Sequence, residues 1–377
     1  MRVLFFNEGN SGSHIMGLAQ GEAAMRVGLG EAPDVDARFV SLAPMGRVST
    51  ALATRRVEPL SRMKVDFHTL RWHVVQSLRA RAQLRRELGT WPAEVVYVKT
   101  QSIALAMSGL MSTVPIVLSV DATVRGWWEM PAWVARHGSA PATIAPSAAL
   151  ERRAMRRAAL VLAWTAWTRR DVEREVPGAR VVEHHPGIDL QRYLPAPRRE
   201  RARPRVLFVG GRFAEKGGED LLAALDGKLG REVDLDLVTP SEAPERPGVR
   251  VHRLSASDPG LLDLYQQADM LVLPTYGDTN PWVLLEAMAC GTPVVSTPVG
   301  GIPDMLDGGR AGVLVPYGDP RALGEGLDAL LADPDRRAQL AGRALARCEE
   351  RYDARRQFVR FAALLRDASQ RAGAIAV

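Results

Sequence analysis

The sequence predicts two α/β domains of similar size, each a doubly wound, Rossmann-like parallel sheet covered by helices. Three observations support this prediction. The chain has 377 residues, which is enough for two domains at roughly 100–200 residues each. In both halves short apolar runs alternate with helical patterns, as is typical of parallel sheets. Between the halves, residues 195–205 form a proline- and arginine-rich stretch without large apolar side chains, which we interpret as the linker.

The first half, residues 1–194, begins with an apolar run that breaks at Glu8 and Gly9. A buried strand followed by a glycine-containing loop and a helix is a typical beginning of a doubly wound domain. Later apolar runs predict further strands, and the stretches between them predict helices. The expected strands are 3–6, 95–98, 116–120, 160–163 and 181–182, and the expected helices include 14–29, 62–88 and 148–159.

The same alternation restarts in the second half, residues 206–352. The expected strands are 206–209, 235–238, 270–273, 294–296 and 313–315, and a helix is expected near 219–225. A further helix has clear start and stop signals. Asn280 is a good N-cap, Pro281 suits the first helical position, and Gly291 suits the end. Residues 353–377 contain an arginine-rich helix that we expect to pack back on the first domain.

Composition excludes several classes of protein. Hydrophobic residues make up 46% and charged residues 24%, as in an ordinary globular chain, so neither disorder nor coiled coil describes the whole. The chain has 2 cysteines, too few for a disulfide framework or a structural zinc site, which favours a reducing compartment. The N-terminus does not resemble a signal peptide, and no apolar run approaches the ~20 residues of a membrane span. We therefore expect a cytoplasmic protein.

Basic residues are concentrated in the first half. Through residue 197 the chain has 25 Lys and Arg against 17 Asp and Glu, whereas the rest has 24 against 26. The basic half either meets an anionic partner or carries a solvated surface. Residues 62–88 combine seven basic and two acidic residues with apolar side chains at helical spacing. Such a helix either contacts anionic lipid at the inner face of a membrane or covers the first sheet, and we favour the second interpretation.

A candidate diphosphate site follows the first strand of the second half. The strand ends in Gly210 and Gly211, and then Arg212, Lys216 and two more glycines precede a helix. Glycines let a ligand approach the backbone, and a helix N-terminus presents free N–H groups with positive potential. A guanidinium and an ammonium four residues apart suit a diphosphate. The alternative is an ordinary strand–helix turn with two surface cations.

Two carboxylates mark a second candidate site within residues 269–304. Glu286 is the only charged residue of an otherwise apolar predicted helix, and a buried carboxylate requires hydrogen-bond donors. Ribose or sugar hydroxyls are suitable donors, whereas the alternative is pairing with an arginine inside the core. Asp278 precedes the same helix and supplies a second carboxylate at that end.

These motifs together resemble a known family. A strand ending in Pro274, a carboxylate, seven residues and then Glu-Ala-Met-Ala-x-Gly-Thr-Pro-Val-Val resemble the nucleotide-sugar signature of the GT4 glycosyltransferases, which are retaining enzymes of the GT-B fold. Gly-Gly-Arg-x3-Lys-Gly at 210–217 resembles the diphosphate segment of that family. Residues 185–189 and 264–269 resemble its interdomain stretch and the helix before its donor strand. The resemblance is dense over 184–317.

The resemblance implies two Rossmann-like domains facing across a cleft, with a nucleotide-diphosphate sugar, of UDP or GDP type, held mainly by the second. Arg212 and Lys216 would neutralise the leaving diphosphate, Glu286 would hold the ribose hydroxyls, and Asp278 would contact the sugar. Further donor contacts are implied for Gly211, Asn280, Pro281, Trp282, Val283, Gly300 and Gly301. Transfer would proceed with retention and without a metal or other cofactor. The acceptor would be a glycan, a lipid-linked glycan or a small molecule, and not a nucleic acid.

The first half matches less closely. Gly12 lies in the position of the family's glycine loop, and Asp121 stands where many members have a histidine that faces the donor sugar. Trp127, Trp128 and Trp133 favour a partly exposed wall for the acceptor over core packing.

The chain also departs from the family pattern in the second half. Asp278 replaces the usual glutamate, and Pro281 replaces a glycine that would offer an N–H group. Two alternatives therefore stay open. One is a nucleotide-sugar epimerase or hydrolase of the same fold, and the other is a non-catalytic relative that only binds the nucleotide sugar.

Overall fold

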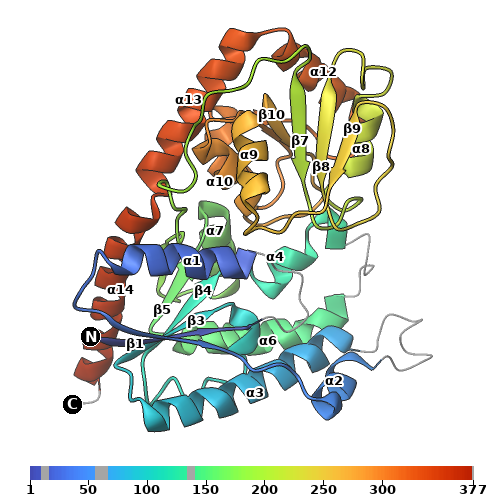
Figure 1. Cartoon of the computed structure of the whole chain (residues 1–377). Helices are drawn as coiled ribbons and strands as arrows, with labels where there is room; N and C mark the ends of the chain where they lie inside the picture. The colour runs from blue at the N-terminus through green and yellow to red at the C-terminus, as the bar shows by residue number, and fades with distance from the viewer. Residues whose placement is uncertain (10–16, 56–66, 134–140, 376–377) are drawn as a thin grey trace.

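The computed structural model describes residues 1–9, 17–55, 67–133 and 141–375. Two six-stranded parallel sheets, each with helices on both faces, lie one above the other (Figure 1). The chain crosses between them twice, and the two crossings run side by side. Ile188 pairs with Asp353 there, and the backbone N–H of Ala354 donates to the Ile188 carbonyl at 3.0 Å. These paired crossings join the two domains.

The first sheet has the strand order β2-β1-β3-β4-β5-β6. Its strands are β1 (Arg2–Asn7), β2 (Asp36–Ser41), β3 (Val95–Lys99), β4 (Ile116–Val120), β5 (Leu160–Ala163) and β6 (Val181–Glu183). One face is covered by α3 (His68–Thr90), α6 (Pro141–Arg157) and α7 (Ala166–Glu175), and the other by α1 (Gly17–Leu29) and α14 (Ala354–Ile375). Side chains of the central strands are fully buried, because both faces are covered.

The C-terminal helix α14 belongs structurally to the first sheet. Phe358, Phe361 and Leu365 lie in one hydrophobic cluster with Phe5 and Tyr97 of β1 and β3. The last helix of the chain thus completes the core of the first domain (Figure 1).

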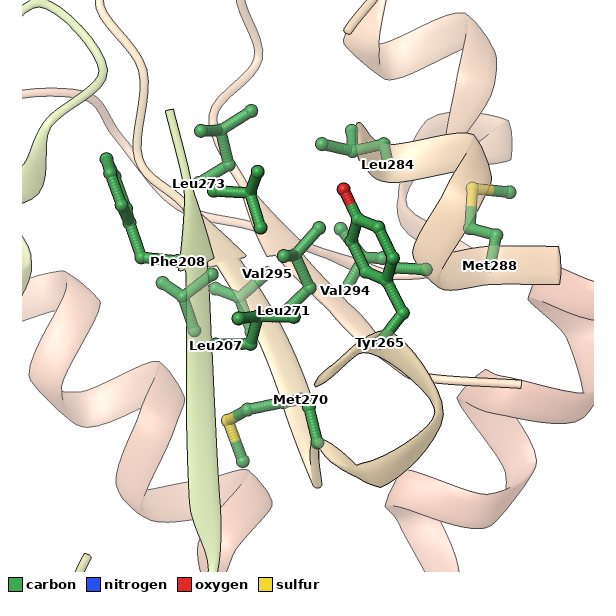
Figure 2. Packing of buried hydrophobic residues seen from close by; sticks show 14 of the residues in the cluster. Leu207, Phe208, Tyr265, Met270, Leu271, Leu273, Leu284, Met288, Val294 and Val295 are labelled. Atoms are coloured by element: carbon green, nitrogen blue, oxygen red, sulfur yellow. The ribbon is translucent and has the colours of Figure 1, made fainter. Parts of the chain in front are cut away.

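The second sheet has the order β12-β11-β10-β7-β8-β9. Its strands are β7 (Arg205–Val209), β8 (Asp234–Val238), β9 (Val249–His252), β10 (Met270–Leu273), β11 (Val294–Ser296) and β12 (Val313–Leu314). Its helices are α8 (Gly218–Ala224), α9 (Pro259–Gln267), α10 (Trp282–Ala289), α11 (Ile302–Met305), α12 (Pro320–Leu331) and α13 (Pro334–Arg351). Figure 2 shows Tyr265 between the strand residue Leu271 and the helix that carries Leu284 and Met288, all within one hydrophobic cluster.

Strand order reverses between β1 and β3 in the first sheet and between β7 and β10 in the second. In open parallel sheets ligands bind at such points, outside the carboxyl ends of the strands. The backbone N–H of Ala132, after β4, donates to the Tyr276 carbonyl, after β10, at 3.0 Å. The ligand-binding edges of the two sheets therefore face one another.

All the predicted strands are present, and four of them have the expected bounds: β4, β5, β10 and β11. The expectation missed β2 and β9. Both contain half-exposed residues with alternating polarity, so they lack the continuous apolar run of a central strand.

The predicted cap of α10 was wrong by one residue. Pro281, not Asn280, is the N-cap, with an extended backbone at φ −70° and ψ 115°. The residues before Pro281 are bound to the loop after β11, because the Gly301 N–H donates to the Thr279 carbonyl at 2.9 Å. The chain therefore enters the helix one residue later than the local pattern indicates.

Candidate active site

The loop after β7 exposes its backbone at one glycine and packs against the loop after β10 at another. A side chain at Gly211 would meet no heavy atom within 4 Å, so the peptide there is open to a ligand. Gly217 begins α8 in the left-handed region at φ +75°, and a Cβ atom there would collide with the Pro274 carbonyl oxygen. Glycine at 217 is therefore required both by conformation and by the close approach of the two loops.

We expect Gly217→Ala to lower the free energy of unfolding by more than about 2 kcal/mol, because the alanine must take a left-handed backbone and displace Pro274. Urea denaturation measures this loss. Gly342→Ala is the matched control, since no heavy atom lies within 4 Å of its Cβ position in α13 and helix propensity favours alanine. Equal stability of the two variants would contradict the assigned loop geometry.

The two cations predicted to bind a diphosphate, Arg212 and Lys216, both lie in the loop between β7 and α8. The Arg212 Nη1 atom lies 2.8 Å from the Glu215 Oε2 atom. Lys216 donates to the Asp278 carboxylate and, at 3.1 Å, to the Gly277 carbonyl. Each cation is therefore balanced by a carboxylate. An incoming diphosphate would replace Glu215 and Asp278 as the partners of these cations.

Glu286 lines a narrow slot next to the glycines that follow β7. Its carboxylate is 1% exposed and accepts hydrogen bonds from Tyr193 Oη at 3.2 Å and Tyr265 Oη at 2.6 Å. Burial raises the pKa of each tyrosine above the usual value for a tyrosine, and the negative charge of Glu286 raises it further. The slot is lined by backbone of Gly210 and Gly211 and by apolar side chains that include Val238, Leu254, Leu261 and Val283. The carboxylate, the glycine backbone and the apolar side chains are groups that a nucleoside and its hydroxyls could contact.

Neither tyrosine was predicted as a partner of Glu286. Tyr265 lies within the 264–269 segment that carries part of the family resemblance, so a signal for it was available. Tyr193 precedes the linker and meets Glu286 only through the tertiary fold.

The first domain reaches this site through Asp121. Its Oδ2 atom accepts a hydrogen bond from Thr279 Oγ1 at 3.2 Å, across the cleft between the domains. Burial raises the pKa of Asp121 above its usual value, and the nearby Asp278 charge adds to this. Gly300 and Gly301 pack closely against the backbone of Asp278 and Thr279. The structure thus brings both predicted aspartates and both glycines together.

Two polar side chains before and in α10 are buried without a hydrogen-bond partner among the described residues. They are the Asn280 amide, of which neither polar atom is bonded, and the Trp282 indole N–H. An unsatisfied buried polar group costs roughly 1–3 kcal/mol, so such groups are candidates for bonds to a ligand. Pro281, between them, has no N–H group to donate.

Lys99 is a buried cation of the first domain that the sequence analysis missed. It ends β3, is 2% exposed, and its Nζ atom lies 5.4 Å from the centroid of the Trp164 ring. Burial lowers the pKa of Lys99 to about 7, and the charges of Glu22 and Asp121 partly oppose this effect. Lys99 ends a strand at the point where the strand order of the first sheet reverses. This position would have marked it as a candidate, but the sequence does not reveal the order of the strands.

Other predicted residues are placed differently. Gly12 lies outside the described residues. Trp127 and Trp133 stack edge to face with centroids 5.7 Å apart and pack with Val299 of the second domain, so they form part of the interdomain contact. Trp128 packs separately against Val124 and its neighbours in the first domain. The three tryptophans therefore do not form one wall.

Two further observations concern the described parts of the chain only. Within residues 1–9, 17–55, 67–133 and 141–375, no three His, Cys, Asp or Glu side chains gather in a way that could hold a metal ion. Over the same ranges, no helix is both long and apolar enough to cross a membrane.

Comparison with solved structures defines the class of this fold. Sucrose-phosphate synthase from Thermosynechococcus elongatus superposes with a TM-score of 0.73 at 16% identity, over 97% of this chain and 98% of that one. The Anabaena protein HepE in complex with UDP-glucose superposes with a TM-score of 0.66 at 17% identity, over 96% and 99%. Two facing doubly wound domains of this kind are the GT-B fold, as the sequence predicted.

Sequence comparison places the chain more narrowly. The family model of glycosyl transferases group 1 matches residues 203–333. Alpha-maltose-1-phosphate synthase of Mycolicibacterium smegmatis is 30% identical over 310 residues, which cover 69% of this chain and 75% of that protein. D-inositol 3-phosphate glycosyltransferase of Streptomyces bingchenggensis is 33% identical over 180 residues, 40% of each chain, so the match spans less than half of that relative. The chain belongs to the glycosyl transferases of group 1.

Proposed function

We propose that this protein transfers a sugar from a nucleotide-diphosphate donor, of UDP or GDP type, to a small acceptor, with retention at the anomeric carbon. One observation carries the proposal. Arg212 directly follows Gly211, which lines the Glu286 slot, and Lys216 lies four residues farther along the same loop. A nucleoside at the slot could therefore extend its diphosphate toward both cations. Cations placed where the leaving diphosphate develops charge stabilise the transition state.

In this proposal Asp278 serves the transferred sugar. Once a diphosphate occupies Lys216, the Asp278 carboxylate becomes available to sugar hydroxyls. Asn280 and the Trp282 indole N–H, both unsatisfied, would add bonds at the same place. The basic pair neutralises the leaving group, so we propose that no metal or other cofactor is needed.

For the acceptor we propose a phosphate-bearing small molecule. The names of two relatives support this, since one is a glycosyltransferase named for inositol 3-phosphate and the other is a synthase named for a phosphate-bearing product, maltose 1-phosphate. A glycan or a lipid-linked glycan would be the acceptor if the phosphate makes no difference.

Thermal shift against UDP, GDP, ADP and dTDP and their sugars, with EDTA or magnesium, tests the donor site. A ligand at 100 times its dissociation constant adds about 2.7 kcal/mol of stability, which raises the melting temperature visibly. We expect one nucleotide to stand out equally with EDTA and with magnesium. Silence across the panel, with and without candidate acceptors, would contradict the proposal.

Asp278→Asn separates an enzyme from a non-catalytic binder. We expect the variant to bind the nucleoside diphosphate as well as the wild type, or better, because Lys216 loses its competing carboxylate. Turnover of the nucleotide sugar should fall about 100-fold or more, because the carboxylate to the sugar is lost. Asp226→Asn, at an 80% exposed side chain, is the control that should change neither. An acceptor-independent release of the nucleotide at the full rate would instead indicate a hydrolase.

A further inference from the structure

We propose that the first domain carries a second ligand site, which binds a hydroxyl-bearing phosphate ester such as a sugar phosphate. The site is a cavity of about 490 Å³ between α4 (Val124–Trp128), α6 and α7 (Figure 1). A volume of roughly 300–1,000 Å³ is typical of small-molecule sites. The described residues that line the cavity are all charged, and we call it the arginine pocket: Arg125, Glu129, Arg152, Arg156, Arg174 and Glu175.

The arginine pocket is separate from the cleft between the domains. Its described lining residues all belong to the first domain. The first turn of α7 touches the second domain, because the Trp167 N–H donates to the Asp304 carboxylate at 2.5 Å. Arg174 and Glu175 lie in the last turn of α7, about 10 Å farther along the helix axis at roughly 1.5 Å per residue. A ligand in the arginine pocket would therefore leave the cleft free.

Glu175 gathers three of the arginines without using up their hydrogen-bond donors. Its side chain is 8% exposed, and its carboxylate oxygens lie 3.6 Å from a guanidinium nitrogen of Arg125 and 3.5 Å from those of Arg152 and Arg174. These distances exceed the roughly 2.7–2.9 Å of a direct charged hydrogen bond. Because each guanidinium has five N–H groups, all three arginines keep donors that a phosphate oxygen could accept.

The arginine pocket also has one more cation than its carboxylates balance. Arg156 is exposed on α6 and takes part in none of the ion pairs between described residues, and it lies one turn from Arg152 on the same face of the helix. The neighbouring Glu151 is largely uncharged at neutral pH, because burial raises its pKa to about 8. The other three arginines pair with three carboxylates, which are Glu129, Glu175 and Asp171.

Glu129 indicates the class of ligand. Its side chain is 51% exposed, and its carboxylate accepts hydrogen bonds from Arg125 Nε at 3.2 Å and Arg174 Nη2 at 3.3 Å. A carboxylate repels a bare anion but accepts hydrogen bonds from hydroxyl groups. A phosphate ester with hydroxyls uses both kinds of group, because its phosphate meets the guanidinium groups while its hydroxyls meet Glu129. The inference does not depend on the proposed sugar transfer in the cleft.

Isothermal titration calorimetry with glucose 6-phosphate and inorganic phosphate tests the proposal. The wild type should bind glucose 6-phosphate about tenfold more tightly than inorganic phosphate, because the hydroxyls add bonds to Glu129. Arg156→Glu should weaken binding of glucose 6-phosphate about tenfold or more. Arg153→Glu is the matched control, because it makes the same change of charge at an exposed position of α6 outside the described lining. Screening should keep its affinity within about threefold of the wild type.

Two further variants test the class of ligand and the place where it binds. Glu129→Ala should remove the preference for glucose 6-phosphate over inorganic phosphate, since the acceptor of the hydroxyls is lost while the guanidinium groups remain. Arg212→Ala with Lys216→Ala should leave binding of glucose 6-phosphate unchanged, because these residues belong to the cleft. Unchanged melting temperatures of all variants would show that the fold is intact.

Three results would overturn the proposal. Equal affinities of the Arg156→Glu and Arg153→Glu variants, or no binding of either probe to the wild type at millimolar concentration, would mean that the arginine pocket holds only an ion-pair network. Loss of binding in the Arg212 and Lys216 variant would place the probe in the cleft. Equal affinities of the wild type for the two probes would exclude a sugar phosphate as the ligand.

Discussion

Replacing Arg212 and Lys216 together with alanine should weaken binding of the preferred nucleoside diphosphate by two to four orders of magnitude. Hydrogen bonds to charged groups contribute roughly 1.5–3 kcal/mol each, and two are removed at once. The loss is reinforced by the residues left behind, because Glu215 and Asp278 remain as unbalanced carboxylates at the position of the diphosphate. Isothermal titration calorimetry measures this effect without knowledge of the acceptor.

A second double variant controls for the change in net charge. Lys228→Ala with Arg231→Ala removes two cations from the same domain, but from the loop before β8, at the amino ends of the strands, whereas the candidate site lies at their carboxyl ends. Lys228 forms an ion pair with Asp328 there and not with any residue of the site. We expect nucleotide affinity within about threefold of the wild type, because screening removes most of the long-range effect. If both double variants bound the nucleotide alike, the diphosphate site would have been assigned wrongly.

Lys99→Met should change how stability depends on pH. Burial lowers the pKa of Lys99 from its usual value of 10.5 to about 7 in the folded protein. Between these two values the unfolded chain binds more protons than the folded chain, so the free energy of unfolding rises with pH, by up to about 1.4 kcal/mol per pH unit. Below about pH 7 both states are protonated, and the buried ammonium destabilises the fold by a constant amount. Methionine removes this penalty, so the variant should be clearly more stable than the wild type at pH 6.

The advantage of the methionine variant should shrink as the pH rises from 7 toward 10. Urea denaturation at pH 6, 8 and 9.5 measures the difference between variant and wild type, which isolates Lys99 from the other titrating groups. Lys99→Arg is the control, because a guanidinium keeps its charge at every pH used and should stay destabilised throughout. A difference between Lys99→Met and the wild type that stays constant from pH 7 to 9.5 would mean that Lys99 does not titrate in this range.

The fold class and the central strands could be predicted from the sequence alone. Parallel strands covered on both faces are continuous apolar runs, and 116–120, 160–163, 270–273 and 294–296 coincide with β4, β5, β10 and β11. The edge strands β2 and β9 lack that signal, because polar residues interrupt their apolar runs, so they were missed, whereas the edge strands β6 and β12 keep a short apolar run and were predicted. The candidate site residues of the second domain could also be predicted from the sequence, because short segments bring them together. Gly211, Arg212 and Lys216 lie within one strand–helix turn. Asp278 precedes a helix, and Glu286 belongs to the same helix.

Only the tertiary structure determined which of these groups meet. The Lys216–Asp278 pair joins residues 62 apart in the chain, and the bond from Thr279 to Asp121 joins residues 158 apart across two domains. The burial of Lys99 depends in the same way on the packing around it, since a Cβ atom at Gly21 would collide with its Nζ atom. Local sequence predicts groups whose spacing is set by a strand, a turn or a helix. Partners, burial and pKa shifts depend on what the whole fold brings within a few ångströms, and no local pattern contains that information.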